Sequence, residues 1–399
     1  MEKAEFLERI SRFQQKLQAK ELSGFLVTQN VDIYYLTGSM QTGYLFVPAE
    51  GEPMFYVRRS VVRAEEEAAV AVRPVGSMRT WGERLKAQFP QLLAGGADGP
   101  QPIVATEYDV LPVQQFQRLQ QLLPGVMWAD GSMLIRETRM IKSAYELDRI
   151  REAARLIDEA LEHALGVLRE GMAEFELMSE IEYFIRRRGH LGLMRMRGYN
   201  QEIVTGMVGG GAAAAMPTYF DGPAGGQGLS PASPQSAGRR SFRRDEPILL
   251  DIGCCIDGYV IDQTRTAVIG ELPEELARAY AVSERILRSA EERLRPGTVS
   301  ESLYAAALEQ AAEAGLSEHF MGYADDQVKF LGHGIGLEID ELPVLAKGFA
   351  YPLEPGMVIA IEPKFTFPGR GVVGIENSYA ITPDGLEKLT LSREGVLRV

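Results

Sequence analysis

Residues 247–270, PILLDIGCCIDGYVIDQTRTAVIG, constrain the fold more than any other stretch of the chain. Two apolar, β-branched runs flank Asp257-Gly258, a dipeptide that favours a two-residue hairpin turn. A turn centred there makes Asp251 and Asp262 diagonal neighbours on one face of the sheet, with backbones about 7–8 Å apart. Two carboxylates at that separation can reach a common cation, and without one they would repel each other.

A second acidic pair lies in residues 356–382, GMVIAIEPKFTFPGRGVVGIENSYAIT, where Glu362 and Glu376 each interrupt an apolar strand. A loop with an even number of residues would put the two glutamates on opposite faces. A three-residue Gly369-Arg370-Gly371 loop, or a bulge at Pro363, would put them on the same face. The placement of the glycines favours the three-residue loop.

His333, in FLGHGIGL, is the histidine that fits this acidic set. Four carboxylates carry four negative charges, which two divalent cations would balance, and a neutral histidine would complete the ligands. Four unpaired acids in buried strands would each cost on the order of several kcal/mol. The pattern therefore predicts a dinuclear metal site. The other histidines lie in helical patterns without ligand spacing: His163, His190 and His319.

Taken in chain order, these residues resemble the pita-bread metallopeptidase family. That family includes prolidase, Xaa-Pro aminopeptidase, methionine aminopeptidase and the metal-free relative creatinase. DIGCCIDGYVIDQTRT, GHGIGL and IEP carry the resemblance, and GFLVTQNVDIYYLTG is similar to the creatinase/prolidase N-terminal domain. The resemblance covers nearly the whole chain.

The resemblance implies two divalent metal ions and a role for each ligand. Asp251 would chelate one ion, and Asp262 and Glu376 would bridge both. His333 and Glu362 would hold the second ion. A hydroxide bridging the ions would be the nucleophile, and Glu362 would also carry a proton to the leaving amine. The oxygen-rich ligand set favours Mn²⁺ or Co²⁺, with Zn²⁺ or Fe²⁺ as alternatives.

The sequence departs from the family around the metal ligands. Asp340 and Thr218 stand where family histidines contact the substrate or its oxyanion, and Gly374 stands where the family has an arginine. Lys329 is a candidate for the missing positive charge. An ionised Asp340 would repel an oxyanion, so it would accept a hydrogen bond from an amine or amide, be held protonated, or lie outside the active site. The candidate catalytic residues are Glu362, Asp340 and Thr218.

A chain of 399 residues is long enough for two cores. Residues 1–133 alternate between helices near 4–21, 60–70 and 80–94 and the strands GFLVT, PMFYVR and PIVAT, which predicts a smaller α/β creatinase/prolidase-like N-terminal domain. Residues 134–399 are expected to form an α+β pita-bread catalytic domain. Its two helical stretches at 168–189 and 294–315 share one plan and indicate duplicated α/β units with pseudo-twofold symmetry.

The stretch 222–247 is rich in Gly, Pro and Ser, which is typical of a mobile solvated loop. Its position directly before the 247–270 hairpin makes a lid the alternative interpretation.

Composition narrows the class of protein. A formal charge of −13 argues against nucleic acid or an anionic membrane as a partner. The adjacent Cys254 and Cys255 are the only cysteines, which fits buried core residues and a reducing, cytoplasmic compartment. The resemblance implies a homodimer that acts on small peptides as a prolidase or Xaa-Pro aminopeptidase. The alternatives are a metal-dependent amidohydrolase of a non-peptide C–N substrate and a non-catalytic binding protein.

Overall fold

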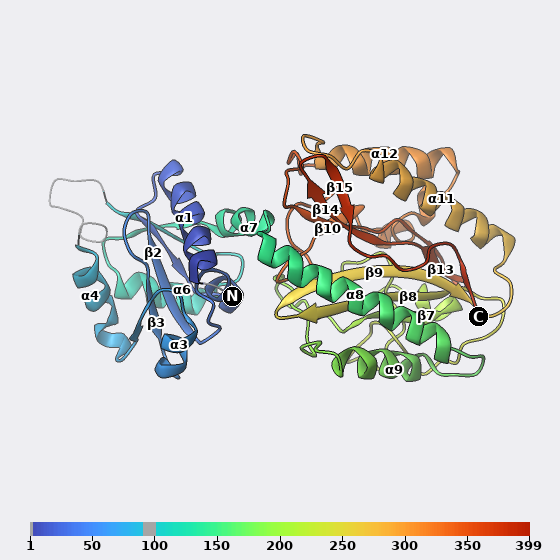
Figure 1. Cartoon of the computed structure of the whole chain (residues 1–399), viewed down its shortest axis with the longest axis horizontal. Helices are drawn as coiled ribbons and strands as arrows, with labels where there is room; N and C mark the ends of the chain where they lie inside the picture. Colours follow the sequence, from blue (N-terminus) through green and yellow to red (C-terminus); the bar gives the residue numbers. More distant parts are fainter. Residues whose placement is uncertain (1–2, 91–100) are drawn as a thin grey trace. The chain divides into compact units, whose positions relative to one another are not determined.

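The computed structural model describes residues 3–90 and 101–399, and the chain divides into two compact units, Met1–Arg139 and Met140–Val399 (Figure 1). The predicted boundary at residue 133 falls inside helix α7 (Ser132–Met140). None of the helices within the described ranges is long and apolar enough to cross a membrane.

The first unit is built around a six-stranded mixed sheet with the order β4-β3-β2-β1-β5-β6. Its strands are β1 (Gly24–Val27), β2 (Gly43–Pro48), β3 (Met54–Val57), β4 (Ala71–Pro74), β5 (Ile103–Thr106) and β6 (Met127–Asp130). The helices beside it are α1 (Lys3–Ala19), α2 (Asn30–Thr37), α3 (Val61–Glu67), α4 (Met78–Gln88) and α6 (Val113–Leu122), with α7 at its end. Its core is rich in buried aromatic side chains, among them Phe25, Phe46 and Trp81.

The three helices and three strands predicted for this unit are present, and α2, β2, β4, α6, β6 and α7 were not predicted. β4 is mostly exposed, so it lacks the apolar alternation that identifies a half-buried strand. The helix predicted at 80–94 ends as α4 at Gln88, and residues 91–94 lie outside the described part of the chain.

The second unit holds two four-stranded sheets and a two-stranded ribbon. One sheet has the order β16-β9-β8-β7 and comprises β7 (Gly206–Gly210), β8 (Ile248–Ile256), β9 (Tyr259–Val268) and β16 (Leu397–Arg398). The other has the order β10-β11-β14-β15 and comprises β10 (Gly332–Gly334), β11 (Val358–Ile361), β14 (Asn377–Thr382) and β15 (Gly385–Lys388). The ribbon pairs β12 (Lys364–Phe367) with β13 (Gly371–Gly374).

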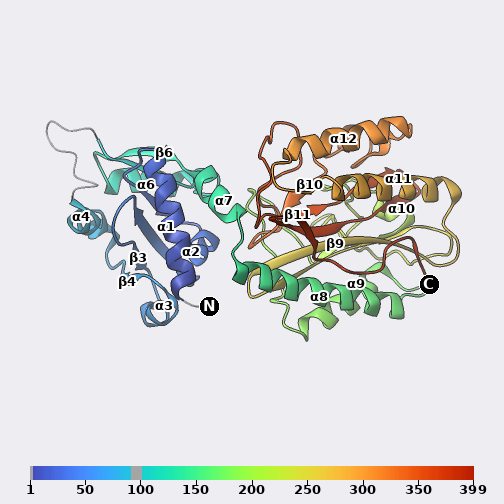
Figure 2. The same ribbon diagram turned by 45° about the horizontal axis from the view of Figure 1, so that its top comes forward.

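Helices cover these strands as two similar pairs (Figures 1 and 2). The first pair is α8 (Ala144–Val167) and α9 (Glu174–Arg186), and the second is α11 (Glu274–Glu291) and α12 (Ser300–Glu313). Both pairs break at a glycine in the left-handed region, Gly171 with φ 83° and Gly297 with φ 88°. The repeated plan matches the duplication expected from the sequence. Shorter elements are α10 (Gly211–Ala214), η1 (Ser317–His319) and η2 (Ala324–Asp326).

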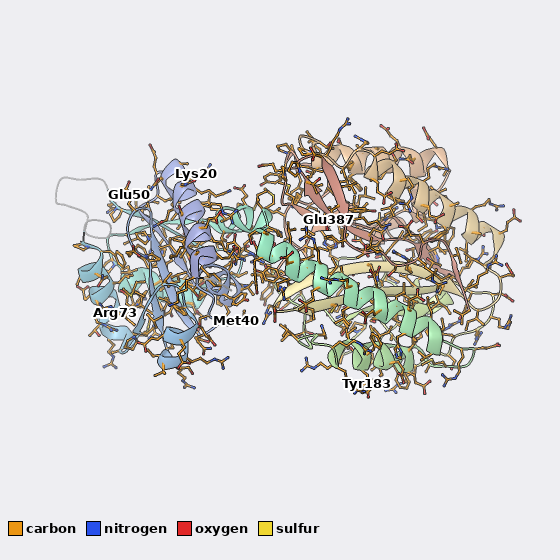
Figure 3. The ribbon with its side chains drawn as sticks, in the orientation of Figure 1. Lys20, Met40, Glu50, Arg73, Tyr183 and Glu387 are labelled. Carbon is orange, nitrogen blue, oxygen red and sulfur yellow. The ribbon has the colours of Figure 1, made fainter. Side chains whose placement is uncertain are left out.

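One ion pair ties the first helical pair to the second sheet. Arg151 of α8 donates through two nitrogens to the carboxylate of Glu387 on β15, at 2.8 and 2.7 Å. Figure 3 labels Glu387 among the side chains of the unit. The bidentate geometry fixes the direction of both side chains.

The β8–β9 hairpin has the predicted register. Its turn is Asp257-Gly258, with φ values of 50° and 95°, and both residues of a type I′ turn require positive φ. Gly253 pairs with Asp262, and Asp251 pairs with Thr264. The two aspartates are therefore diagonal neighbours on one face, as predicted.

The β12–β13 ribbon has a loop with the predicted odd number of residues, but the loop lies at different positions in the chain. Phe367 pairs with Gly371, so the loop is residues 368–370 rather than the predicted 369–371. The predicted loop was wrong by one residue because Gly371, with φ 138°, can still pair as the first residue of β13. An odd loop length is retained, so Glu362 and Glu376 stand at directly opposed positions.

The 222–247 segment is packed rather than freely solvated, which corrects the interpretation as a mobile loop. Phe242 is buried, as are Ser236 and Ala237. The buried carboxylate of Glu174 on α9 accepts hydrogen bonds from the N–H groups of Gly238, at 2.8 Å, and Gly210, at 2.9 Å. Composition gave no sign of these anchors, because they come from residues outside the segment.

Candidate metal centre

The five predicted ligands converge on one place in the second unit. They form two trios, Asp262–His333–Glu376 and Asp251–Glu362–Glu376, and the ligand atoms within each trio lie within 4.8 Å of one another. Glu376 belongs to both trios, so the two sites share a carboxylate. This is the arrangement expected of a binuclear centre or of a single ion beside a second cation.

Strand pairing places each ligand. Asp251 and Asp262 lie inside β8 and β9, where the hairpin register sets their distance. His333 lies in β10 opposite Ala360 of β11. Glu362 lies in the short gap between β11 and β12, and Glu376 lies in the short gap between β13 and β14. Their backbone N–H groups donate to Leu331 O at 3.0 Å and to Thr264 O at 3.1 Å, which ties β10 and β9 to the same centre.

The Asp262–His333–Glu376 trio fits a divalent cation. Oε1 of Glu376 is buried and has no hydrogen-bond partner in the part of the chain that the structure describes. An orphaned carboxylate oxygen is costly unless a cation takes it up. Nδ1 of His333 lies 3.2 Å from Gly334 O, and a hydrogen bond donated there leaves the Nε2 lone pair for a ligand. Two carboxylates and an imidazole are common ligands of Mn²⁺, Fe²⁺, Co²⁺ and Zn²⁺.

The Asp251–Glu362–Glu376 trio surrounds an amine of the chain itself. Nζ of Lys364 lies 2.5 Å from Glu362 Oε2, 3.1 Å from Asp251 Oδ2 and 3.2 Å from Glu376 Oε2. The lysine side chain is fully buried. Strand alternation puts residue 364 on the same face as residue 362, which aims the lysine into the centre.

The stem of Lys364 crosses Gly374, its partner on β13. A Cβ at position 374 would come within 2.6 Å of Lys364 Cγ and 2.7 Å of Pro363 O. Contacts below 3.0 Å require the neighbours to move, so glycine is needed for this path of the lysine.

A buried layer behind the carboxylates holds Glu376 in place. Thr264 Oγ1 donates to Glu376 Oε2 at 2.6 Å. Arg265 is fully buried, and its Nη1 donates to the backbone carbonyls of Thr264, at 2.8 Å, and Glu376, at 2.7 Å. Its Nη2 donates to Asn377 Oδ1 at 2.8 Å and Ser392 O at 3.0 Å. These contacts orient the shared carboxylate before any ligand binds.

The electrostatics follow from burial and crowding of like charges. Burial, reinforced by the charges of Glu376 and Asp251, raises the pKa of Asp262 well above its ordinary value. Burial also raises the pKa of Glu362 to about 7, although the neighbouring Lys364 opposes this shift. Burial alone would lower the pKa of Lys364, but the charges of Asp251, Glu362 and Glu376 raise it well above its ordinary value. The acidic side chains thus favour a nearby cation.

His333 responds to the same acids. Burial would lower its pKa, whereas the charges of Glu362 and Asp340 raise it. Asp340 is exposed, and its charge also adds to the burial that raises the pKa of Asp221. The charge of Asp340 thus acts on both His333 and Asp221.

Thr218 and Lys329 are less directly involved. The Thr218 hydroxyl donates to Pro234 O at 2.6 Å, which uses its proton inside the 222–247 segment. Lys329 is exposed. The positively charged side chain that pairs with the acids is Lys364, which was not predicted as a site residue. Its signal was a lysine in an apolar strand two positions after Glu362, on the same strand face.

Arg265 was also missed, although a charged residue inside VIDQTRTAVIG is unusual for a buried strand. The cysteines agree with the prediction: Cys254 and Cys255 are free and buried, and burial raises their pKa values, to about 12 and about 11.

A carboxylate-rich centre between two strand hairpins, with helix pairs outside, defines the pita-bread class of metal-dependent hydrolases. Residues 148–383 match metallopeptidase family M24, and residues 9–141 match the creatinase/prolidase N-terminal domain. The first match covers more than half of the chain. The chain therefore belongs to metallopeptidase family M24.

Relatives of known name cover almost the entire chain. It is 30% identical over 370 residues to the probable dipeptidase PepE of Mycobacterium bovis, which covers 91% of this chain and 88% of that protein. It is 25% identical over 386 residues to the Xaa-Pro dipeptidase of Pyrococcus horikoshii, with 96% and 97% covered. The crystal structure of dipeptidase PepE from Mycobacterium ulcerans is similar with a TM-score of 0.81 and 26% identity, and 100% and 99% of the two chains are covered.

Proposed function

We propose that the protein is a metal-dependent peptidase that cleaves dipeptides and other short peptides, with Xaa-Pro peptides as the leading candidates. The observation that carries the proposal is the Asp262–His333–Glu376 trio, whose ligand atoms lie within 4.8 Å of one another, together with Glu376 Oε1, which has no hydrogen-bond partner among the described residues. Similarity to a probable dipeptidase and to an Xaa-Pro dipeptidase supports the choice of substrate.

Asp262, His333 and Glu376 would hold the cation. When bound, a divalent ion supplies Lewis acidity toward a substrate carbonyl oxygen and toward water. Manganese or cobalt suits the oxygen-rich ligands, with zinc or iron as alternatives.

Glu362 is the residue that would move the proton. Its Oε2 is engaged by Lys364 at 2.5 Å, while its Oε1 faces His333 Nε2 at 3.5 Å. Oε1 can accept a proton from the attacking water and return it to the leaving amine. Lys364 keeps the carboxylate in one orientation during both transfers.

Asp340 would select the substrate by its free amine. It is exposed, and its charge reaches His333. A carboxylate accepts hydrogen bonds from an ammonium group and repels an oxyanion, so Asp340 suits the amino end of a short peptide. The protein is also proposed to be a cytoplasmic homodimer, with the second copy of the chain as its partner.

The test is hydrolysis of a panel of Xaa-Pro dipeptides, other dipeptides and Xaa-Pro tripeptides after reconstitution with Mn²⁺ or Co²⁺. Glu362→Gln should lower kcat about 10²–10⁴-fold with metal still bound. Glu387→Gln, which changes an acid of the same unit outside the centre, is the matched control and should keep activity. Metal-dependent cleavage of other amides, with no cleavage of any peptide, would identify the non-peptide amidohydrolase instead. Peptide binding without turnover would identify a binding protein.

A further inference from the structure

The centre contains a positive charge that belongs to the chain. Lys364 Nζ lies within 3.2 Å of oxygens from Asp251, Glu362 and Glu376. An ammonium group has three N–H donors, and three acceptors at these distances use all of them. The same three carboxylates form one of the two trios that could hold a metal ion.

The lysine is held in this position. Its side chain is fully buried, and its stem lies over Gly374, where no Cβ fits. An ammonium moved out of the cluster would need new acceptors in a buried environment, which is costly. A divalent ion in this trio would share its oxygens with the ammonium and lie a few ångströms from it, where like charges repel strongly.

The other trio has the opposite character. Glu376 is the carboxylate that this trio shares with the other, and its Oε1 has no hydrogen-bond partner among the described residues, whereas its Oε2 accepts from Thr264 and Lys364. One carboxylate thus has one oxygen satisfied by the chain and one left for a ligand.

We propose that Lys364 takes the place of one of the two divalent ions, so that each chain binds a single ion at Asp262, His333 and Glu376. The four acids then meet three positive charges, one from the ammonium and two from the ion. This proposal rests on the proposed function only in that the protein binds metal at all. It changes the expected stoichiometry from two ions to one and makes Lys364 a fixed counter-ion of the centre.

The experiment is metal analysis of the purified full chain after dialysis against excess Mn²⁺, with electron paramagnetic resonance of the bound ion. The wild-type protein is expected to hold one ion per chain with the spectrum of an isolated Mn²⁺. Lys364→Ala is expected to hold two ions and to show magnetic coupling between them. Lys388→Ala removes an ion-paired lysine outside the centre and should leave one ion.

Two ligand variants locate the ion. In the wild-type background, Asp262→Asn should abolish binding, and Asp251→Asn should leave one ion per chain. The reverse result would place the ion in the lysine-bearing trio and overturn the proposal. Two ions in the wild-type protein, or one ion in a folded Lys364→Ala variant, would also overturn it while leaving the proposed function intact.

Absence of any bound ion in the wild-type protein would overturn the proposed metal-dependent function together with this inference. Thermal unfolding monitored by circular dichroism keeps the test decisive. If Lys364→Ala does not fold without metal, its unfolding is followed with Mn²⁺ present throughout. Lys364→Met, which keeps the stem without the charge, then replaces Lys364→Ala in the metal analysis. Lys364→Met should also hold more metal than the wild-type protein, and an unchanged single ion would again contradict the proposal.

Discussion

Lys364 and Gly374 are direct cross-strand partners, and the lysine reaches the carboxylates only because its partner has no side chain. A Cβ at position 374 would come within 2.6 Å of Lys364 Cγ. The resemblance to the pita-bread family placed an arginine at 374, on the opposite strand. In this chain position 374 is instead a glycine, which accommodates the stem of Lys364.

Gly374→Ala should therefore lower the free energy of unfolding by about 1–3 kcal/mol, because the added methyl group overpacks the ribbon. The loss should be smaller in a Lys364→Ala background, where Cγ is absent, although contact with Pro363 O remains. A double-mutant cycle in urea measures the coupling between the two positions. Gly166→Ala, on α8 with open space around its Cβ, is the control and should be neutral or stabilising. Additive losses at 364 and 374 would contradict the packing argument.

Thr264→Val should weaken binding of the divalent ion about 10–100-fold, because it removes the 2.6 Å hydrogen bond that orients Glu376. Valine keeps the shape of threonine, so steric effects are small. Thr264→Ser retains the hydroxyl and is the matched control, with affinity expected near that of the wild-type protein. Titration calorimetry with Mn²⁺ gives both constants. Equal weakening by valine and serine would show that the methyl group, and not the hydrogen bond, matters.

Arg265→Met should lower the free energy of unfolding by at least about 3 kcal/mol, since it leaves several buried acceptors unpaired, including Glu376 O and Ser392 O. Arg393→Met removes an exposed arginine paired with Glu162 and should cost about 1 kcal/mol or less. Denaturant unfolding compares the two variants. Similar losses would mean that the buried arginine adds little to the fold.

His190 should make the stability of the fold depend on pH. Its Nδ1 accepts a hydrogen bond from Cys255 N–H at 3.0 Å, and burial, assisted by the charge of Arg186, lowers its pKa. The unfolded chain therefore binds the proton more readily than the folded one. This contribution is complete above the unfolded value of about 6.5, decreases as the pH falls through that value, and levels off below the folded pKa.

The measurement is urea unfolding of the wild-type protein and of His190→Asn between pH 8 and pH 5. The free energy of unfolding should depend less steeply on pH in the asparagine variant. A His190 variant with an unchanged slope would refute this assignment.

The sequence predicted the parts of the centre that local rules govern. An Asp-Gly turn determines which residues of β8 and β9 face each other, so the position of Asp262 relative to Asp251 could be worked out in advance. The odd number of residues in the loop between Glu362 and Glu376 could also be predicted, although the exact loop residues could not.

The remaining features depend on contacts distant in sequence. Lys364 meets Asp251 from another hairpin, and Arg265 reaches Ser392 near the end of the chain. No periodicity within a single strand contains that information. The anchoring of the 222–247 segment by Glu174 is of the same kind.

The lysine in the carboxylate cluster also bears on how the metal-free chain folds. A metal ion has to be acquired from the cell, whereas Lys364 is part of the polypeptide and is ion-paired with Asp251, Glu362 and Glu376 in the folded chain. The chain itself thus partly neutralises these acids. Part of the charge that neutralises the centre is therefore encoded in the polypeptide and does not depend on the supply of metal.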